Sequence, residues 1–210
     1  EPNLVVGLKG LVGAEIRVTG PKGDQHSGLH GGAIANPLMA ISQIVASMKG
    51  LDGQILIDEF YDDVRDLSDE ERADIARIPY DEAAYIKELG VSELFGEVGY
   101  STRERLWARP TLDVNGIWGG YQGSGTKTVH PAEASVKITC RLVSDQRPDK
   151  IYDLIERHVG RSTPPGVRAV VTRLAGSADP FVMPRSQVAA EVLQEVYGSK
   201  PYVTRLGGSI

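Results

Sequence analysis

One ten-residue stretch constrains the fold more than any other part of the chain. From Ala134 to Val143, apolar residues take every second position, and polar residues fill the positions between them as far as Leu142. The two sets are Val136, Ile138, Cys140 and Leu142 on one side and Lys137, Thr139 and Arg141 on the other. This period of two predicts a strand whose one face is buried. Such a strand needs further strands beside it and helices over its apolar face.

Other segments supply those partners. Strand patterns cover residues 11–19, 111–117 and 167–174. Helix patterns begin at Pro37, after the capping residue Asn36, and end near Gly50; they recur from Pro148 to Gly160 and from Ser186 to Gly198, and a short strand follows. Without residues 51–107 the order is strand, helix, strand, strand, helix, strand. This order predicts an α+β fold of the ferredoxin-like split β-α-β type, an antiparallel sheet with helices on one face.

Residues 51–107 are expected to form a helical insertion between these core elements. Ser68 with Glu71, and Ser101 with Glu104, both have the spacing of a capping box. Asp81 can cap a third short helix that ends near Gly90.

Composition narrows the function classes. The net charge is −5, so there is no basic excess for a general nucleic-acid or anionic-membrane binder. No apolar run approaches the roughly 20 residues that span a bilayer. The single cysteine, Cys140, excludes a disulfide framework and a cysteine-based zinc site. We therefore expect a protein of a reducing compartment, the cytoplasm, with no nucleic-acid or membrane partner.

A glycine-rich loop over residues 20–32 holds two of the four histidines, His26 and His30. Glycine is costly in conformational entropy, so such a loop often serves a close approach or a sharp turn. A histidine placed there is a candidate for acid–base, oxyanion or metal chemistry. A glycine-rich turn with a solvated histidine explains the pattern equally well.

Several other patterns are weaker indications of a functional site. Residues 120–128 resemble a phosphate loop, but Thr126 separates the glycine from Lys127 and a strand follows rather than a helix. The spacing of His26 and His30 would suit zinc on a helix, yet the surrounding glycines make a helix improbable, and no metal site is expected within this chain. His158 falls on an apolar helix stripe and is expected to be packed. Arg141 lies on the polar face of its strand, where it can grip a carboxylate or simply be solvated.

Taken together, these segments resemble the lid, or dimerisation, region of the zinc peptidase family that includes carnosinase-like dipeptidases, carboxypeptidase G and succinyl-diaminopimelate desuccinylase. The resemblance rests on an ordered set of motifs: Gly7-Leu-Lys-Gly10, Gly20-Pro21, Asp24-Gln-His-Ser-Gly28, Gly31-Gly32, Asn36-Pro37, Arg109-Pro110-Thr111, Gly119-Gly120-Tyr121, Lys127-Thr-Val-His-Pro131, Arg141-Leu142-Val143 and Arg205-Leu-Gly-Gly-Ser-Ile210. It runs almost end to end. The insertion and the Gly-Gly-Tyr segment favour the dipeptidase branch.

The resemblance implies how the chain is divided and what it does. Residues 1–180 would be the lid, and residues 181–210 would begin the returning half of the catalytic domain. The family's two zinc ions per subunit would be bound outside this chain, which begins at Glu1 without a methionine and is expected to be an excised piece, inactive alone. The parent enzyme would be a two-fold homodimer that cleaves dipeptides or N-acyl amino acids.

The resemblance also implies residue roles. His26 would reach into the partner subunit's active site and stabilise the oxyanion, and Thr128 would serve the same site. Arg141 would bind the substrate carboxylate, and a turn would contact the substrate through Gly207, Gly208 and Ser209. Gln25 replaces the family's usual leucine. His130 stands where the family mostly has an apolar residue, and we expect it to face solvent.

Three alternatives remain open. One is a metal-dependent deacylase of the same family, similar to acetylornithine deacetylase or the desuccinylase. Another is a ferredoxin-like ligand-binding module with no enzymatic role. The third is a free-standing hydrolase that uses His26 with a metal ion of its own.

Overall fold

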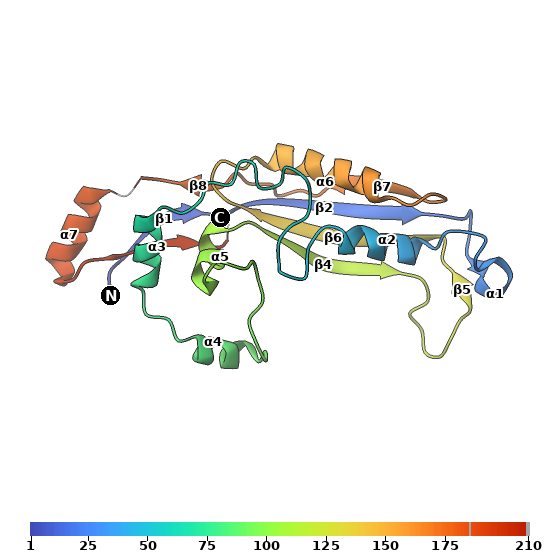
Figure 1. The fold of residues 1–210 in the computed structure, drawn as a ribbon, viewed down its shortest axis with the longest axis horizontal. Coiled ribbons are helices and arrows are strands. Elements are labelled where there is room, and N and C mark those ends of the chain that lie inside the picture. Colours follow the sequence, from blue (N-terminus) through green and yellow to red (C-terminus); the bar gives the residue numbers. More distant parts are fainter. Residues whose placement is uncertain (185, 209–210) are drawn as a thin grey trace.

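A computed structural model describes residues 1–184 and 186–208 (Figure 1). The strands are β1 (Asn3–Leu8), β2 (Gly10–Thr19), β3 (Gln25–His26), β4 (Thr111–Gly119), β5 (Val129–His130), β6 (Glu133–Leu142), β7 (Arg168–Arg173), β8 (Phe181–Val182) and β9 (Tyr202–Leu206). The helices are α1 (Ser27–His30), α2 (Pro37–Ala46), α3 (Asp69–Ala76), α4 (Glu82–Leu89), α5 (Thr102–Ala108), α6 (Pro148–Ser162) and α7 (Gln187–Tyr197).

A four-stranded antiparallel sheet forms the centre of the molecule, with strand order β4-β6-β2-β7. Taken in chain order, β2, α2, β4, β6, α6 and β7 make the split β-α-β arrangement. The predicted α+β fold is therefore confirmed, and the strand patterns at residues 11–19, 111–117, 134–143 and 167–174 fall on β2, β4, β6 and β7.

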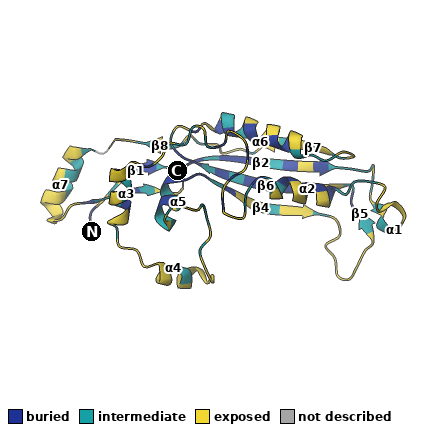
Figure 2. Cartoon of the chain, in the orientation of Figure 1, coloured by how far each residue is buried: buried dark blue, intermediate teal, exposed yellow. Residues whose placement is uncertain are grey.

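The core lies between this sheet and the helices α2 and α6, which cover one of its faces (Figure 2). The alternating apolar residues of β6 are fully buried there, including Ile138 and Cys140. Burial raises the pKa of the Cys140 thiol to about 12, so this thiol stays protonated and only fills space. His158 of α6 is packed as expected, with its Nε2 atom 2.8 Å from Ser47 Oγ.

Two helix ends differ from the sequence prediction. α2 ends at Ala46, because residues 47–50 turn back and Lys49 pairs with Ile55. α6 continues through Gly160 to Ser162, since Gly160 keeps helical geometry and Thr163 Oγ1 bonds the Val159 carbonyl beyond it. A glycine near a helix end is thus a stop signal only where the chain turns.

The insertion contains the three expected short helices, α3, α4 and α5. Both capping boxes form, at Ser68 with Glu71 and at Ser101 with Glu104. Asp81 caps α4, which ends on the left-handed Gly90. The first part of the insertion nevertheless belongs to the main core, where Ile55, Ile57 and Phe60 are buried.

A second, smaller sheet was not expected at the start of the chain. β1 pairs in parallel with β9 and antiparallel with β8. The outgoing and returning chain segments also touch where they enter and leave the four-stranded sheet, because Leu11 and Ala178 exchange two backbone hydrogen bonds of 2.8 and 2.9 Å. We call this crossing, residues 9–11 with 178–180, the neck. A Cβ on Gly10 would lie 2.6 Å from the Ala178 carbonyl oxygen, so the neck requires glycine there.

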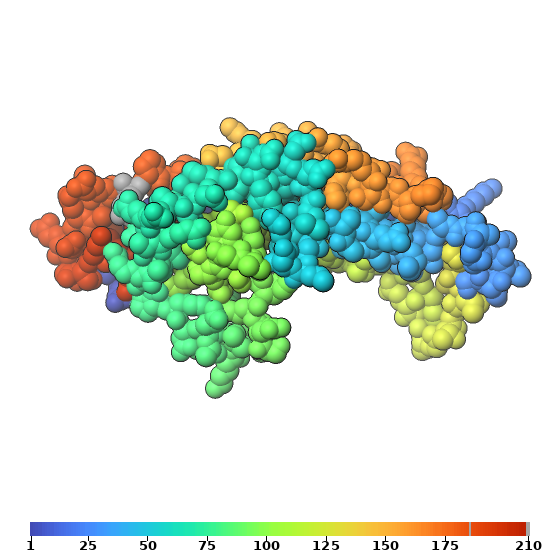
Figure 3. Space-filling view, viewed as in Figure 1, coloured from blue at the N-terminus to red at the C-terminus, as the bar shows by residue number. Residues whose placement is uncertain are grey.

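The molecule is long, with the four-stranded sheet along its length. The α1–β5 end lies at one extreme and α7 at the other (Figure 1). Two parts project on the same side, the α4 region and the 120–128 loop (Figure 3). Among the described residues, no helix has the length and apolar character to cross a bilayer.

Candidate functional site

The structure brings His26 and Thr128 together at the far end of the long sheet. They are 102 residues apart in sequence, yet β3 and β5 pair so that His26 lies opposite Val129. A backbone hydrogen bond of 3.0 Å joins Ser27 N to the Thr128 carbonyl. The Thr128 hydroxyl oxygen then lies 3.2 Å from His26 Nε2. The two residues predicted to serve one site are therefore neighbours in space.

His26 is held in place by the short helix α1 that follows it. Its Nδ1 atom accepts a 3.0 Å hydrogen bond from Gly28 N, which makes His26 the N-cap of this single turn. The expectation that the glycines make a helix improbable here is wrong for residues 27–30. One turn closes because Gly31 N donates to the Ser27 carbonyl at 2.7 Å, and a Cβ on Gly31 would approach that oxygen to 2.4 Å.

Neighbouring residues fix the loop to the sheet. Asp24 Oδ1 accepts a 2.9 Å hydrogen bond from Ala132 N, just before β6. Gln25, the departure from the family pattern, lies opposite His130 in the β3–β5 pair and bonds the Gly23 carbonyl. His130 is only 8% exposed, so the expectation that it faces solvent is wrong. Its Nδ1 atom has no hydrogen-bond partner among the described residues. It occupies the buried side of β5.

Arg141 lies at the opposite end of the sheet, near the neck. It is half-buried on β6, between Leu11 of β2 and Thr111 of β4. Lys9 lies close to it, at the junction of β1 and β2, and is 3% exposed. Burial, and then the charge of Arg141, lower the pKa of Lys9 to about 7. The Lys9 ammonium donates to the Arg105 carbonyl of α5 at 3.0 Å.

Gly207 and Gly208 share this end of the molecule. They follow β9, whose last residue, Leu206, accepts a 3.2 Å hydrogen bond from Lys9 N. A Cβ on Gly207 would lie 3.0 Å from the Leu106 carbonyl, so the turn packs against α5. Ser209, predicted for the same turn, lies outside the described residues.

The predicted residues thus form two groups at opposite ends of one sheet. β2 connects them, running from Gly10 beside the neck to Thr19 before the His26 loop. Ten residues of strand span about 30 Å, so His26 and Arg141 of one chain cannot touch the same small substrate. Lys9 is the polar residue at the neck that sequence reasoning missed; a lone lysine in the apolar run of residues 4–14 was its only signal.

Comparison with known proteins decides the family. A family model described as "Peptidase dimerisation domain" matches residues 6–167. The chain belongs to this family. The dimerisation domain is also 30% identical to the Cys-Gly metallodipeptidase DUG1 of Saccharomyces cerevisiae and 25% identical to the human Beta-Ala-His dipeptidase, with all of the chain aligned to each. It spans 45% and 43% of those two proteins, less than half of their length.

Solved structures agree. The dimerisation domain superposes on the dipeptidase Dug1p of Saccharomyces cerevisiae with a TM-score of 0.82 and 27% identity, covering 100% of this chain and 45% of that one. Human carnosine dipeptidase 1 gives a TM-score of 0.81 at 25% identity, covering 100% and 46%. The metallo-carboxypeptidase Sso-CP2 from Sulfolobus solfataricus gives 0.81 at 32% identity, covering 100% and 48%. Two of these relatives, the Cys-Gly metallodipeptidase DUG1 and the metallo-carboxypeptidase Sso-CP2, are named as metallopeptidases.

No group of three or more His, Cys, Asp and Glu in the described part of the dimerisation domain is arranged to hold a metal ion. The residues described here therefore do not fit a two-zinc centre. His26 is the N-cap of the one-turn helix α1 and His30 is its last residue, and within the described residues they belong to no group of three possible metal ligands. The 120–128 segment leads into the strand β5, so it lacks the helix that directly follows a phosphate loop.

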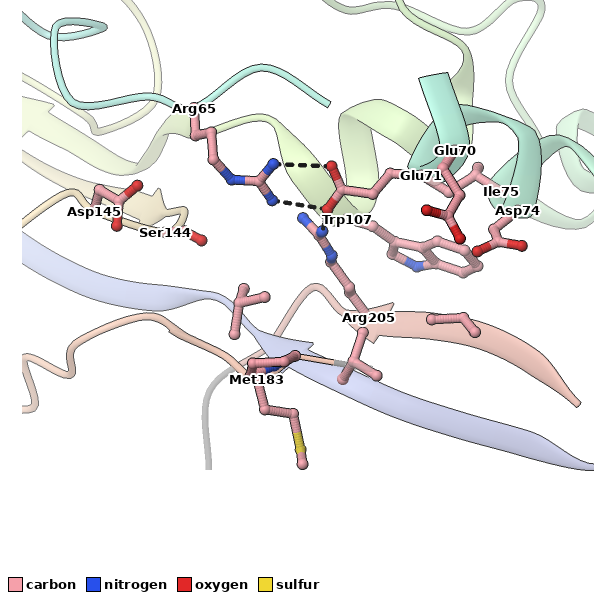
Figure 4. Close-up of a pocket in the computed structure, with 14 residues that line it drawn as sticks. Arg65, Glu70, Glu71, Asp74, Ile75, Trp107, Ser144, Asp145, Met183 and Arg205 are labelled. Carbon is pink, nitrogen blue, oxygen red and sulfur yellow. Dashed lines mark hydrogen bonds and ion pairs between the residues drawn. The ribbon is translucent and has the colours of Figure 1, made fainter. Parts of the chain in front are cut away.

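The dimerisation domain also has a pocket of about 490 Å³ between the small sheet and the insertion (Figure 4). Glu71 of α3 is its central group. Its carboxylate receives two hydrogen bonds from Arg65, at 2.7 and 2.9 Å, and an ion pair from Arg205 of β9. The hydrogen bonds from Arg65, the Ser68 backbone N–H and the charge of Arg205 together lower the pKa of Glu71 to about 2. None of the predicted site residues that the structure describes lines this pocket, whose polar groups join α3 to β9.

Proposed function

We propose that this chain is the dimerisation and lid domain of a homodimeric metallo-dipeptidase, and that each lid completes the active site of the other subunit. The relatives named above as dipeptidases support the peptidase activity and a dipeptide substrate. The zinc ions of this family would be held by the part of the enzyme outside this chain. That part would continue from the small sheet, so that residues 3–8 and 181–208 join the catalytic domain.

The observation that carries the proposal is the wide separation of the two groups of predicted residues. A single chain places the pair His26–Thr128 about 30 Å from Arg141 and the Gly207–Gly208 turn. A two-fold axis can remove this separation, because it brings the far end of one lid to the near end of the other.

This two-fold axis would pass through the exposed edge of β4, where two copies of the strand would pair. β4 pairs only with β6 in the described chain and presents Val114, Ile117 and Trp118 to solvent. An open apolar edge strand is a template for pairing with another chain. Antiparallel pairing of two β4 strands sets the Gly119 end of one beside the Thr111 end of the other. Thr111 is the residue that pairs with Arg141, so the partner's 120–128 loop would arrive next to Arg141.

The proposed chemistry follows from the side chains. His26 would donate a hydrogen bond to the oxygen of the scissile carbonyl as it gains negative charge, and Thr128 would support the same site. Arg141, aided by the turn of residues 207–209, would bind the substrate carboxylate through a bidentate contact. The isolated chain would then be inactive, because it would contribute only some of the residues of each active site and none of the metal ligands.

Mixed dimers test this arrangement directly. In the full-length enzyme, His26→Ala is expected to lower kcat by about 10²–10³, the usual loss for one oxyanion donor. Arg141→Ala is expected to be similarly defective. When equal amounts of the two variants are unfolded and refolded together, half of the dimers are mixed, and each has one intact site. About a quarter of the wild-type activity should therefore return.

A matched control uses two variants of the same group. Mixing His26→Ala with Thr128→Ala leaves every site with one defect, so no activity should return. Recovery in this control, or no recovery in the first mixture although mixed dimers have formed, would show that the two groups do not meet across the dimer.

A further inference from the structure

We propose that Gly28 is a positioning residue, whose backbone N–H fixes the His26 ring as the tautomer that carries its proton on Nε2. The effect of this tautomer on catalysis rests on the function proposed above, but the tautomer itself can be measured without any activity.

The hydrogen bond to Nδ1 decides where the proton is. A backbone N–H can only donate, and Gly28 N lies 3.0 Å from His26 Nδ1. Nδ1 must therefore offer its lone pair, and a neutral imidazole then carries its hydrogen on Nε2. A proton on Nδ1 would set two donors against each other and break this contact.

Because the hydrogen bond from Gly28 holds Nδ1, the Nε2 atom on the other side of the ring points away from the loop that carries His26. On that side the ring meets the Thr128 hydroxyl, 3.2 Å away, which can accept the Nε2 hydrogen because a hydroxyl oxygen has two lone pairs. His26 itself is exposed. The Nε2–H group is thus available to an incoming acceptor, and the hydrogen bond to Thr128 keeps this group in one orientation until the acceptor binds.

Gly28 is also the residue that leaves room for the ring. A Cβ at this position would lie 2.9 Å from His26 Cε1 and 3.1 Å from Nδ1. The backbone at Gly28 is not in the left-handed region, so an alanine is tolerated by the main chain. An exposed ring can swing aside at little cost. Alanine at position 28 should therefore displace the His26 ring while leaving the fold intact.

This arrangement suits an oxyanion donor. Such a donor must present a hydrogen, in a fixed direction, to the place where negative charge develops. A ring held at Nδ1 by the main chain presents Nε2–H without further reorganisation. A merely solvated histidine would sample both tautomers and several orientations.

Nitrogen NMR of the histidine rings tests the tautomer on the 210-residue chain. At about pH 8, where an ordinary imidazole is neutral, His26 should give the pattern of an Nε2–H ring, and a His26→Gln variant identifies its signals. Gly28→Ala should remove that single pattern. Gly23→Ala is the matched control, since a Cβ on Gly23 of the same loop meets nothing within 4 Å. An Nδ1–H ring in the unmodified chain, or an unchanged His26 pattern in Gly28→Ala, would overturn the proposal.

Kinetics on the full-length enzyme separate this proposal from the function it rests on. Gly28→Ala should lower kcat about tenfold with KM nearly unchanged, because a misaligned donor loses transition-state stabilisation. Gly23→Ala should match the unmodified enzyme in both constants. If His26→Ala lowers kcat but Gly28→Ala does not, the positioning role fails and the function stands. If neither variant changes kcat while the NMR result holds, the proposed function fails and the tautomer stands.

Discussion

At the scale of single residues, the neck contains a buried lysine, Lys9, whose pKa is lowered. Lys9 is 3% exposed, and its ammonium donates a hydrogen bond to the Arg105 carbonyl. Burial and the charge of Arg141 lower its pKa to about 7 from 10.5. Because the folded state disfavours the charged form, the unfolded chain binds more protons between about pH 7 and 10.5. Lys9 therefore destabilises the fold most below pH 7, and this penalty declines as the pH rises through that window.

Lys9→Met tests the sign of this effect. The free energy of unfolding of the unmodified chain, measured relative to the variant, should rise between pH 7 and 8.5, by at most about 1.4 kcal/mol per pH unit. Urea unfolding of both proteins at several pH values gives the difference, in which other titrating groups cancel. A difference that stays constant or falls with pH would contradict the depressed pKa.

At the scale of elements, the Glu71 carboxylate joins α3 to β9. Glu71 closes the capping box of its own helix and also binds Arg65 and Arg205. The pKa of Glu71 is lowered to about 2, so its ionised form stabilises the fold above about pH 4.5, and this stabilisation is lost as the pH falls towards 2.

Glu71→Gln should lower the free energy of unfolding by about 1–2 kcal/mol near neutral pH, because charge-assisted hydrogen bonds become neutral ones. The loss should shrink below pH 4, where the carboxylate of the unmodified protein is itself becoming protonated. Glu195→Gln, at an exposed position of α7, serves as the control in the same urea titrations. An equal loss at pH 3 and pH 7 would mean that shape, not charge, is what Glu71 contributes.

The elements also show what a sequence can and cannot predict. β6 and β2 were predictable because their alternation reflects burial on one face, and α2 because Asn36 and Pro37 mark its start. β3 and β5 were not, since two-residue strands have no period and exist only through pairing with each other. The same holds for the site. The glycines marked the His26 loop as unusual, but the contact with Thr128 depends on a pairing between distant segments, and only the family resemblance suggested it.

At the scale of the whole molecule, the two sheet edges differ. β4 exposes Ile117 and Trp118, whereas β7 at the opposite edge exposes Val170. Ile117→Lys would place like charges near each other across a β4–β4 interface, while an exposed lysine costs the single chain little. We expect this variant to weaken the proposed dimer at least tenfold, as measured by sedimentation of the full-length protein.

Val170→Lys is the matched control on the other edge. It makes the same kind of change at a similarly exposed β position, 43% against 50% for Ile117, and should leave the dimer intact. Dissociation by Val170→Lys alone would assign the interface to β7 and remove the route by which the partner's loop reaches Arg141.

In the proposed lid, the neck and His26 lie at opposite ends of a long lever arm. The outgoing and returning chains are hydrogen-bonded to each other at Leu11 and Ala178, and His26 lies beyond the far end of β2, about 30 Å away. One degree of rotation at the neck therefore displaces the histidine by about 0.5 Å, which is already the tolerance of a catalytic contact. If the proposed lid were held only at its neck, small rotations there would move His26 by several times this tolerance. Contact with a second lid would hold His26 in one position. Dimerisation would then determine how accurately the site is assembled as well as which residues form it.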